Sequence, residues 1–294
     1  MNRPRSFVQL ARPHQYVKNG FIWLPVFFGR RLHDPGAVLD VAVAFVVFCL
    51  AASSVYVLND LRDAEEDRRH PAKKSRPIAA GTVRPGEAWG FMGALLGSAA
   101  VLCLTLLPLK LFLFLGMYLL LNLAYSWGLK HRAVIDVTCI ATGFVLRVFA
   151  GGAASGVEPS HWLILMTFLL ALFLALSKRR DDLILAAQGH NCRKSLDGYN
   201  LEFVSLSMGF MASVILVSYI LYTVSPEVVS KYETRQLYLT AFWVVLGLLR
   251  YMQITFVREG SGSPTLVLLK DGFLQTVLLL WIGSFYLLLY GIGA

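Results

Sequence analysis

The sequence contains little charge. Only 15% of its 294 residues are Asp, Glu, Lys or Arg, whereas 56% are hydrophobic and the mean hydropathy is +0.61. This composition excludes a water-soluble globular domain, in which about a quarter of the residues are charged, and it also excludes a disordered chain or a coiled coil. We therefore expect a protein that crosses the membrane several times, with the bilayer as its surroundings.

Cysteine and histidine are also scarce. The four cysteines show no CxxC spacing, which excludes a disulfide scaffold and a zinc site; they are Cys49, Cys103, Cys139 and Cys192. The six histidines show no metal-ligand spacing. Any metal site must therefore be built from other side chains.

Acidic residues are fewer than basic ones, at 18 against 27, which gives a net charge of +9. In a soluble protein this excess would suggest a nucleic-acid partner. In a membrane protein it reflects the Lys and Arg that gather in cytoplasmic loops, so we expect no nucleic acid.

Eight apolar runs are long enough to cross a bilayer as helices, which takes about 17 to 25 residues each. A ninth helix is expected at about 15–30, although Lys18 and Pro25 lie within it. The fold class predicted is an all-α integral membrane bundle of about nine transmembrane helices, forming a single domain over residues 1–294. The eight runs lie near residues 37–58, 86–107, 109–127, 133–152, 159–177, 203–224, 236–256 and 273–292.

The distribution of basic residues predicts the orientation. With nine helices and a cytoplasmic N-terminus, 20 Lys and Arg fall on the cytoplasmic side and 5 on the other. The basic N-terminal segment and the short apolar stretch after it argue against a cleaved signal peptide. We expect a plasma-membrane protein with its C-terminus outside, and two long cytoplasmic cap loops, Leu61 to Pro85 and Lys178 to Leu201, at the site of chemistry.

An acidic array follows the second expected helix. Asn59, Asp63 and Asp67 recur at four-residue steps and share one helix face. Their oxygen donors suit Mg²⁺ held together with substrate phosphates. We expect Asn59, Asp60, Asp63 and Asp67 to be catalytic, with Asn59, Asp63 and Asp67 as metal ligands. The alternative is a solvated acidic helix end paired with neighbouring arginines.

A basic loop comes next, from His70 to Gly81, with two prolines. Its Lys73 and Arg76 are candidates for binding diphosphate oxygens, because arginine donates two parallel hydrogen bonds to a phosphate. Taken alone, the loop is also typical of any cytoplasmic loop.

These motifs resemble the UbiA superfamily of intramembrane prenyltransferases. The resemblance rests on NxxxDxxxD from Asn59 to Asp67 and on RPxxxG from Arg76. Three further elements also match: Arg12-Pro13, Lys18-Asn19, and Tyr125-Ser126 leading to Lys130. It implies a Mg²⁺-dependent enzyme that binds an isoprenyl diphosphate, with Lys18, Tyr125 and Lys130 as further substrate-binding residues.

The second acidic motif of that family is missing. After the sixth expected helix the sequence reads Ser177-Lys178-Arg179-Arg180-Asp181-Asp182, and two adjacent acids point about 100° apart, so they do not replace a DxxxD. The pattern is similar to the branch that transfers 5-phosphoribose from phosphoribosyl pyrophosphate to decaprenyl phosphate, releasing diphosphate, in cell-wall arabinan synthesis. In that branch's loop, Arg193 to Leu196 and Tyr199 also match. Lys178 and Arg179 are then candidates for binding the donor's 5-phosphate.

Two other functions remain open on the sequence. One is a conventional prenyltransferase that uses a polyprenyl diphosphate donor, and the other is an anionic solute transporter, which would show paired interrupted helices in two repeats. Asp136 either orients a lysine such as Lys130 or caps its helix, and Arg147 contacts either substrate or neighbouring carbonyls. A homo-oligomer is compatible with the sequence, which does not determine it.

Overall fold

The computed structural model describes residues 3–69, 73–188, 194–258 and 263–291, and within these ranges it contains helices and no strand. Eight of the described helical segments are long and apolar enough to cross a membrane. They coincide with the eight expected runs, so the all-α membrane fold is confirmed. They are α3 (Pro35–Arg62), α5 (Pro85–Leu106), α6 (Leu109–Trp127), α7 (Ile135–Ser155), α8 (His161–Ala187), α9 (Leu201–Val224), η4 with α11 (Gln236–Phe256), and α13 with a π-helical turn (Gly272–Gly291).

The chain divides into two compact units. Unit 1 comprises Met1–Leu129 and Gly143–Pro159, and unit 2 comprises Lys130–Thr142 and Ser160–Ala294. Helix α7 contributes its first turns to unit 2 and the rest to unit 1. The expectation of a single domain stays a prediction.

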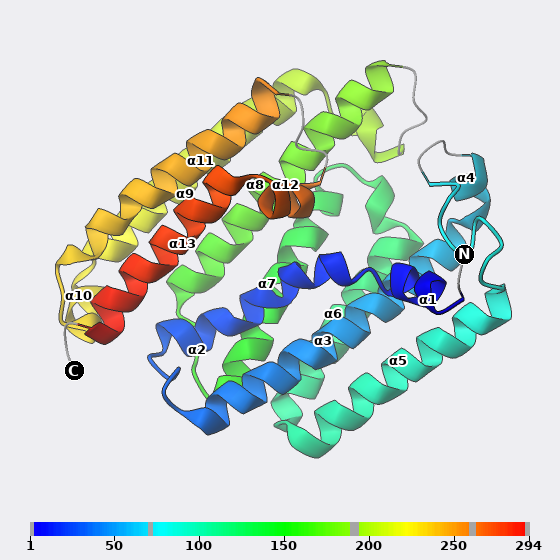
Figure 1. The fold of residues 1–294 in the computed structure, drawn as a ribbon. Coiled ribbons are helices and arrows are strands. Elements are labelled where there is room, and N and C mark those ends of the chain that lie inside the picture. The colour runs from blue at the N-terminus through cyan, green and yellow to red at the C-terminus, as the bar shows by residue number, and fades with distance from the viewer. Residues whose placement is uncertain (1–2, 70–72, 189–193, 259–262, 292–294) are drawn as a thin grey trace. The chain divides into compact units, whose positions relative to one another are not determined.

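In unit 1, α3 and α5 lie side by side (Figure 1). Asp34 begins α3 by accepting hydrogen bonds from the backbone of Gly36 and Ala37, and Pro35 occupies the first helical position. The core of this unit is apolar, with Phe48 and Leu111 fully buried. One end of the unit gathers α1 (Arg3–Ala11), α4 (Ala64–Arg69) and the loop that leads into α5 (Figure 1).

The ninth expected helix is not one continuous α-helix. Its place is taken by a 3₁₀ helix, η1 (Pro13–Trp23), and the five-residue α2 (Leu24–Phe28). Helix α7 packs closely on this segment, because a Cβ at Gly151 would lie 2.0 Å from the carbonyl oxygen of Ile22. The expected count of about nine is therefore approximate.

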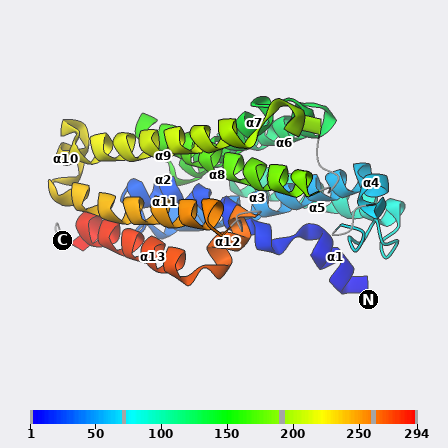
Figure 2. The same cartoon turned by 90° about the horizontal axis from the view of Figure 1, so that it is seen from above.

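In unit 2, α8 lies beside α9, and α11 (Ala241–Phe256) lies beside α13 (Gly272–Tyr286), in both views (Figures 1 and 2). Phe173, Met208 and Val204 are buried between these helices. The remaining elements of the unit are short: α10 (Pro226–Tyr232), α12 (Pro264–Lys270) and η3 (Lys194–Gly198).

The two long loops are shorter than expected. Helix α8 continues ten residues past the expected end at 177, since Lys, Arg and Asp ended the apolar run but not the helix. In the first loop, α4 follows α3 after a single residue, Asp63. The acidic array from Asn59 and the basic residues from Lys178 therefore both begin within helices, and the helices fix the backbone at these positions.

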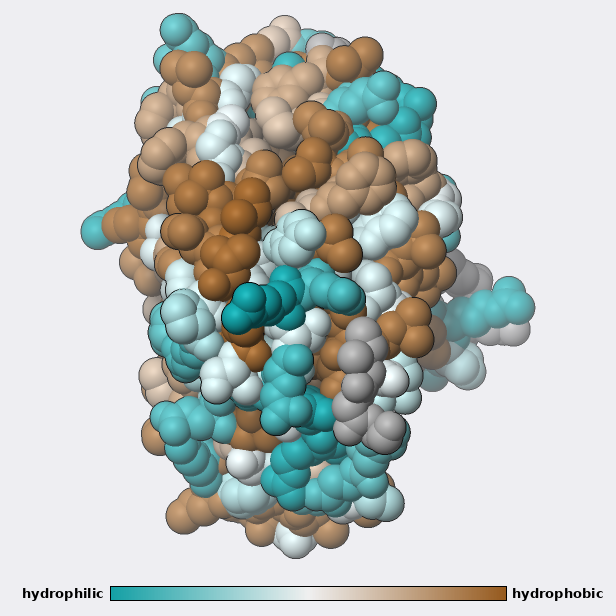
Figure 3. Space-filling view, turned by 90° about the vertical axis from the view of Figure 1, so that its left-hand side faces the viewer, coloured by the Kyte–Doolittle hydropathy of each residue, from teal (hydrophilic) through white to brown (hydrophobic). Residues whose placement is uncertain are grey.

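Much of the outer surface is apolar. Figure 3 shows hydrophobic residues over much of one face, interrupted by polar ones. Leu109, Leu206 and Leu279 are each more than 60% exposed. Exposed leucines on long helices are what a hydrocarbon solvent accepts and water does not.

Candidate functional site

The acidic array lies in unit 1, where α3 runs into α4. Asp63 ends α3 with φ −90° and ψ 6°. The backbone still hydrogen-bonds at four-residue steps, from Asp63 N to Asn59 O at 2.9 Å and from Asp67 N to Asp63 O at 2.8 Å. The helical stacking of Asn59, Asp63 and Asp67 thus continues across the break, as the spacing predicts.

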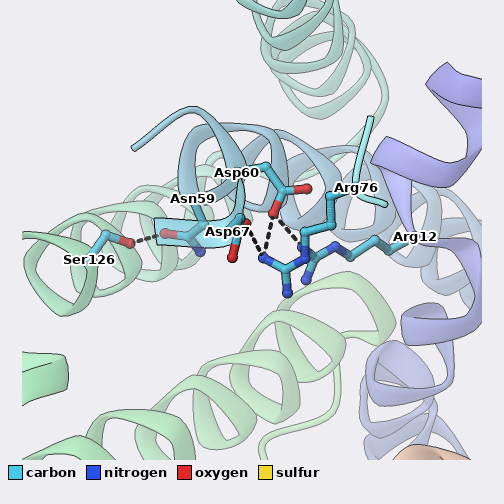
Figure 4. Close-up of polar contacts among 6 residues, drawn as sticks. All are labelled: Arg12, Asn59, Asp60, Asp67, Arg76 and Ser126. Atoms are coloured by element: carbon cyan, nitrogen blue, oxygen red, sulfur yellow. Dashed lines mark hydrogen bonds and ion pairs between the residues drawn. The ribbon is translucent and has the colours of Figure 1, made fainter. Parts of the chain in front are cut away.

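Two of the acids are buried and hold arginines. Asp60 is 2% exposed and Asp67 is 3% exposed. Arg76 Nη1 donates to Asp60 at 3.1 Å and to Asp67 at 2.7 Å, and Arg12 donates to the same oxygen of Asp60 (Figure 4). Asp60 therefore links two arginines that come from opposite sides of α3 in the sequence.

Asn59 is held by α6. The hydroxyl of Ser126 donates to Asn59 Oδ1 at 2.5 Å (Figure 4). Nearby, the guanidinium of Arg62 lies 5.2 Å from the ring centroid of Trp127. The half-buried Tyr125 precedes Ser126 in this last turn of α6. Both contacts fix the end of α6 against the end of α3. Tyr125 therefore lies directly before a residue that contacts the array.

The two arginines are positioned by irregular backbone. Arg12 has φ 54°, in the left-handed region, and its guanidinium lies 5.1 Å from the ring centroid of Tyr56. Arg76 sits in a turn in which its N–H donates to the carbonyl oxygen of Lys73 at 2.9 Å. Gly81 closes this loop with φ 72°, which glycine adopts without strain.

The donor set fits Mg²⁺. It offers only oxygen atoms, from one amide and three carboxylates, and oxygen is what this hard cation binds. In the described ranges, no three His, Cys, Asp or Glu are arranged as a ready metal site. Arg12 and Arg76 are paired with one oxygen of Asp60, and Arg76 also with one oxygen of Asp67. The residues therefore fit a cation that arrives with substrate phosphates, to which the arginines can also donate.

Lys18 and Arg147 belong to unit 1 as well. Lys18 is half-buried in η1. Arg147 is 5% exposed, and its guanidinium donates to Asn19 Oδ1 at 2.7 Å, to Tyr118 at 3.0 Å and to its own helix at Gly143. This network consists of two side-chain oxygens and one carbonyl of its own helix, and both roles left open for Arg147 stay predictions.

The other predicted residues lie in unit 2. Lys178 and Lys130 are half-buried. Arg179 is fully buried, and its Nε donates to Asp136 Oδ2 at 2.6 Å while its Nη1 donates to Asp182 at 2.7 Å. Direct binding of a phosphate by Arg179 stays a prediction.

Asp136 accepts hydrogen bonds from two side chains of unit 2. It is fully buried, and its two oxygens accept from Arg179 Nε and from the hydroxyl of Tyr199, the latter at 2.7 Å. Asp136 is therefore paired with an arginine of α8, and both roles expected for it stay predictions. Burial and the hydrogen bond to Asp136 raise the pKa of Tyr199, which keeps the hydroxyl protonated as a donor.

Several contacts were missing from the sequence-based site. Arg12 and Ser126 were part of the family resemblance, but neither was among the expected site residues. Their positions next to other residues of the matched motifs were the signal that could have indicated a role in the site. The pairing of Asp136 with Arg179 had no local signal, because 43 residues separate them. His70 and Arg193 lie outside the described residues.

Comparison with known proteins identifies relatives over the whole chain. A protein from Corynebacterium glutamicum named decaprenyl-phosphate phosphoribosyltransferase is 35% identical, covering 98% of this chain and 88% of its own. One of the same name from Mycolicibacterium smegmatis is 35% identical, covering 96% and 92%. The structure of a UbiA homolog from Archaeoglobus fulgidus bound to GPP and Mg²⁺ superposes with a TM-score of 0.72 at 19% identity, covering 97% and 99%. Residues 21–263 match the sequence pattern of the UbiA prenyltransferase family, and the chain is a member of that family.

Proposed function

We propose that the protein transfers 5-phosphoribose from phosphoribosyl pyrophosphate to a polyprenyl phosphate and releases diphosphate. The observation that carries the proposal is the charge in the C-terminal part of α8. Where a second acidic array would serve a second metal site, Lys178, Arg179 and Arg180 occupy the helix, and Asp182 is engaged by Arg179. Phosphoribosyl pyrophosphate carries an additional phosphate that needs such cations. The names of the relatives with 35% identity support the same reaction.

The diphosphate end of the donor is assigned to unit 1. Arg12 and Arg76 are 22% and 28% exposed at their side chains, so both can also donate to phosphate oxygens while Asp60 and Asp67 stay paired. A Mg²⁺ bound by Asn59, Asp63 and Asp67 would supply the positive charge that stabilises the leaving diphosphate. Lys73 and Lys18 are further cations of this unit that we assign to phosphate oxygens.

The acceptor needs no strong general base. A lipid monophosphate is already anionic, so the chain's residues need to orient the reactants and neutralise charge. The bond from the anomeric carbon to the diphosphate breaks as the lipid phosphate oxygen attacks from the opposite face, through an oxocarbenium-like transition state. Direct attack inverts the α-linked donor to a β-linked product. Lys130, Tyr125 and Lys178 are assigned to binding the reactants.

A labelled-donor assay separates this function from its rivals. Purified protein is incubated with Mg²⁺, polyprenyl phosphate and either labelled phosphoribosyl pyrophosphate or labelled polyprenyl diphosphate with an aromatic acceptor. The proposal predicts a new labelled lipid phosphate only with the first label. A product only with the second label identifies a conventional prenyltransferase, and uptake of an anionic solute into vesicles without any product identifies a transporter.

We further propose that the protein lies in the plasma membrane with the array facing the cytoplasm, the N-terminus inside and the C-terminus outside. The excess of Lys and Arg in the corresponding loops supports this orientation. A C-terminal alkaline phosphatase fusion should be active, and a C-terminal green fluorescent protein fusion should be dark. The reverse pattern would contradict the orientation.

A further inference from the structure

The turn before α7 holds a strained residue. Val134 has φ 66°, and a β-branched side chain at positive φ is a conformational outlier. The N–H of Ile135 donates to the carbonyl oxygen of Ala133 at 2.8 Å, which closes a tight turn of three residues about Val134. The side chain of Val134 is 54% exposed, so its own burial does not hold the turn in place.

Tyr199 holds this turn from the loop after α8. Its hydroxyl accepts from the N–H of Val134 at 2.6 Å and donates to Asp136 Oδ1 at 2.7 Å. The hydroxyl therefore uses its proton and a lone pair at once. Asp136 is held in turn by Arg179, with both side chains fully buried.

A second contact joins the same two segments independently. A Cβ at Gly198 would lie 2.5 Å from the Cβ of Ala133, so only glycine lets η3 approach the turn this closely. Gly198 and Tyr199 are adjacent in sequence, and Ala133 and Val134 are adjacent too. Two neighbouring contacts of different kinds thus fasten the end of the long loop to the turn.

We propose that Tyr199 is a positioning residue that fixes the strained turn at Val134, and with it the preceding backbone that carries Lys130 and Arg132. Strain that is kept at an exposed position points to a required backbone geometry, because side-chain packing does not demand it. Arg179 then acts by holding Asp136, which orients Tyr199. The inference rests on the proposed function only in assigning Lys130 to substrate binding.

The test uses Tyr199→Phe, which removes both hydrogen bonds and keeps the ring. Kinetics should show KM for phosphoribosyl pyrophosphate or for polyprenyl phosphate raised about tenfold, with a smaller change in kcat. Hydrogen–deuterium exchange of the full-length protein in detergent should be faster in residues 130–136. Tyr238→Phe is the matched control, since this tyrosine of unit 2 is 53% exposed; it should match the wild type.

Val134→Gly provides the decisive arm. Glycine adopts positive φ without strain, so the turn no longer needs Tyr199 to hold it. In the Tyr199→Phe background, Val134→Gly should return KM to within about threefold of the wild type. A purely structural role of Tyr199 predicts a lowered melting temperature with unchanged KM and no rescue, and that result would overturn the proposal. Unchanged exchange at residues 130–136 in Tyr199→Phe would overturn it as well, and this arm needs no substrate, so it separates the fate of this inference from that of the proposed reaction.

Discussion

Two arginine–carboxylate clusters in this protein differ in exposure. In unit 1, Asp60 and Asp67 are buried, but the side chains of their partners Arg12 and Arg76 are 22% and 28% exposed. In unit 2, Arg179 and Asp136 are both fully buried. The first cluster leaves its cations within reach of a ligand, whereas the second encloses its cation among protein oxygens.

This difference separates binding from positioning. A partly exposed arginine can donate to a phosphate through the N–H groups that its buried acid leaves unused, because water and ligand both reach it. A buried pair loses several kcal/mol when one partner leaves, because the other stays desolvated and uncompensated. Similar residue types therefore take different roles, and each role predicts a different response to mutation.

The largest effect on stability is expected at the enclosed pair. Asp136→Asn should lower the free energy of unfolding by about 3 to 5 kcal/mol, since Arg179 would remain buried without this partner charge. Denaturant titration in detergent measures the change. The double variant Asp136→Asn, Arg179→Gln should recover a large part of it. An Asp136→Asn variant as stable as the wild type would show that the pair of Asp136 and Arg179 does not stabilise the fold.

The acids of the array should affect turnover instead. Asp63→Asn and Asp67→Asn should each lower kcat by about a hundred- to a thousandfold, the typical loss when one charge-stabilising group is removed. Melting temperatures should stay near the wild type, because Arg76 keeps Asp60 as a partner when Asp67 is neutralised. Glu66→Gln, an exposed acid of α4, is the control. Wild-type rates in both Asp variants would remove the metal assignment.

A smaller effect is expected at Lys178, which is half-buried and directly precedes Arg179 in the sequence. Lys178→Gln should raise KM for phosphoribosyl pyrophosphate about ten- to a hundredfold with kcat little changed, since one charged hydrogen bond contributes about 1.5 to 3 kcal/mol. Lys110→Gln, an exposed lysine at the start of α6, is the control. An unchanged KM would reassign the 5-phosphate to Lys73 or Arg76.

The smallest effect is expected at Ser126, which orients Asn59 by one hydrogen bond of 2.5 Å. Ser126→Ala should lower kcat about two- to tenfold, in line with about 0.5 to 1.5 kcal/mol for a neutral hydrogen bond. Asn59→Ala should cost more than Ser126→Ala but less than Asp67→Asn. Steady-state kinetics of the three variants gives the order, and a Ser126→Ala effect as large as that of Asp67→Asn would contradict it.

Local features of the site were predictable from the sequence. The stacking of Asn59, Asp63 and Asp67 follows from helical periodicity, and the return of Arg76 to Asp67 spans only nine residues. The membrane helices were predictable because length and apolarity decide them. The end of α8 was not, because charged residues end an apolar run without ending a helix.

Pairings between residues far apart in the chain could not be predicted from the sequence. Arg12 meets Asp60 across 48 residues and Tyr199 meets Asp136 across 63. No periodicity encodes which helices meet, and one chain contains many acids and arginines. The strain at Val134 was equally hidden, because valine has no preference for positive φ and the surrounding contacts impose it.

The most direct test of the account is the Mg²⁺ dependence of donor binding. Calorimetry of the purified protein with phosphoribosyl pyrophosphate, with and without Mg²⁺, should show binding at least about a hundredfold tighter with the cation. Asp67→Asn should lose this dependence, whereas Glu66→Gln should keep it. Equal affinity with and without Mg²⁺ in the wild type would contradict the account, since the array at Asn59 to Asp67 would then bind the donor without the metal for which its oxygens are suited.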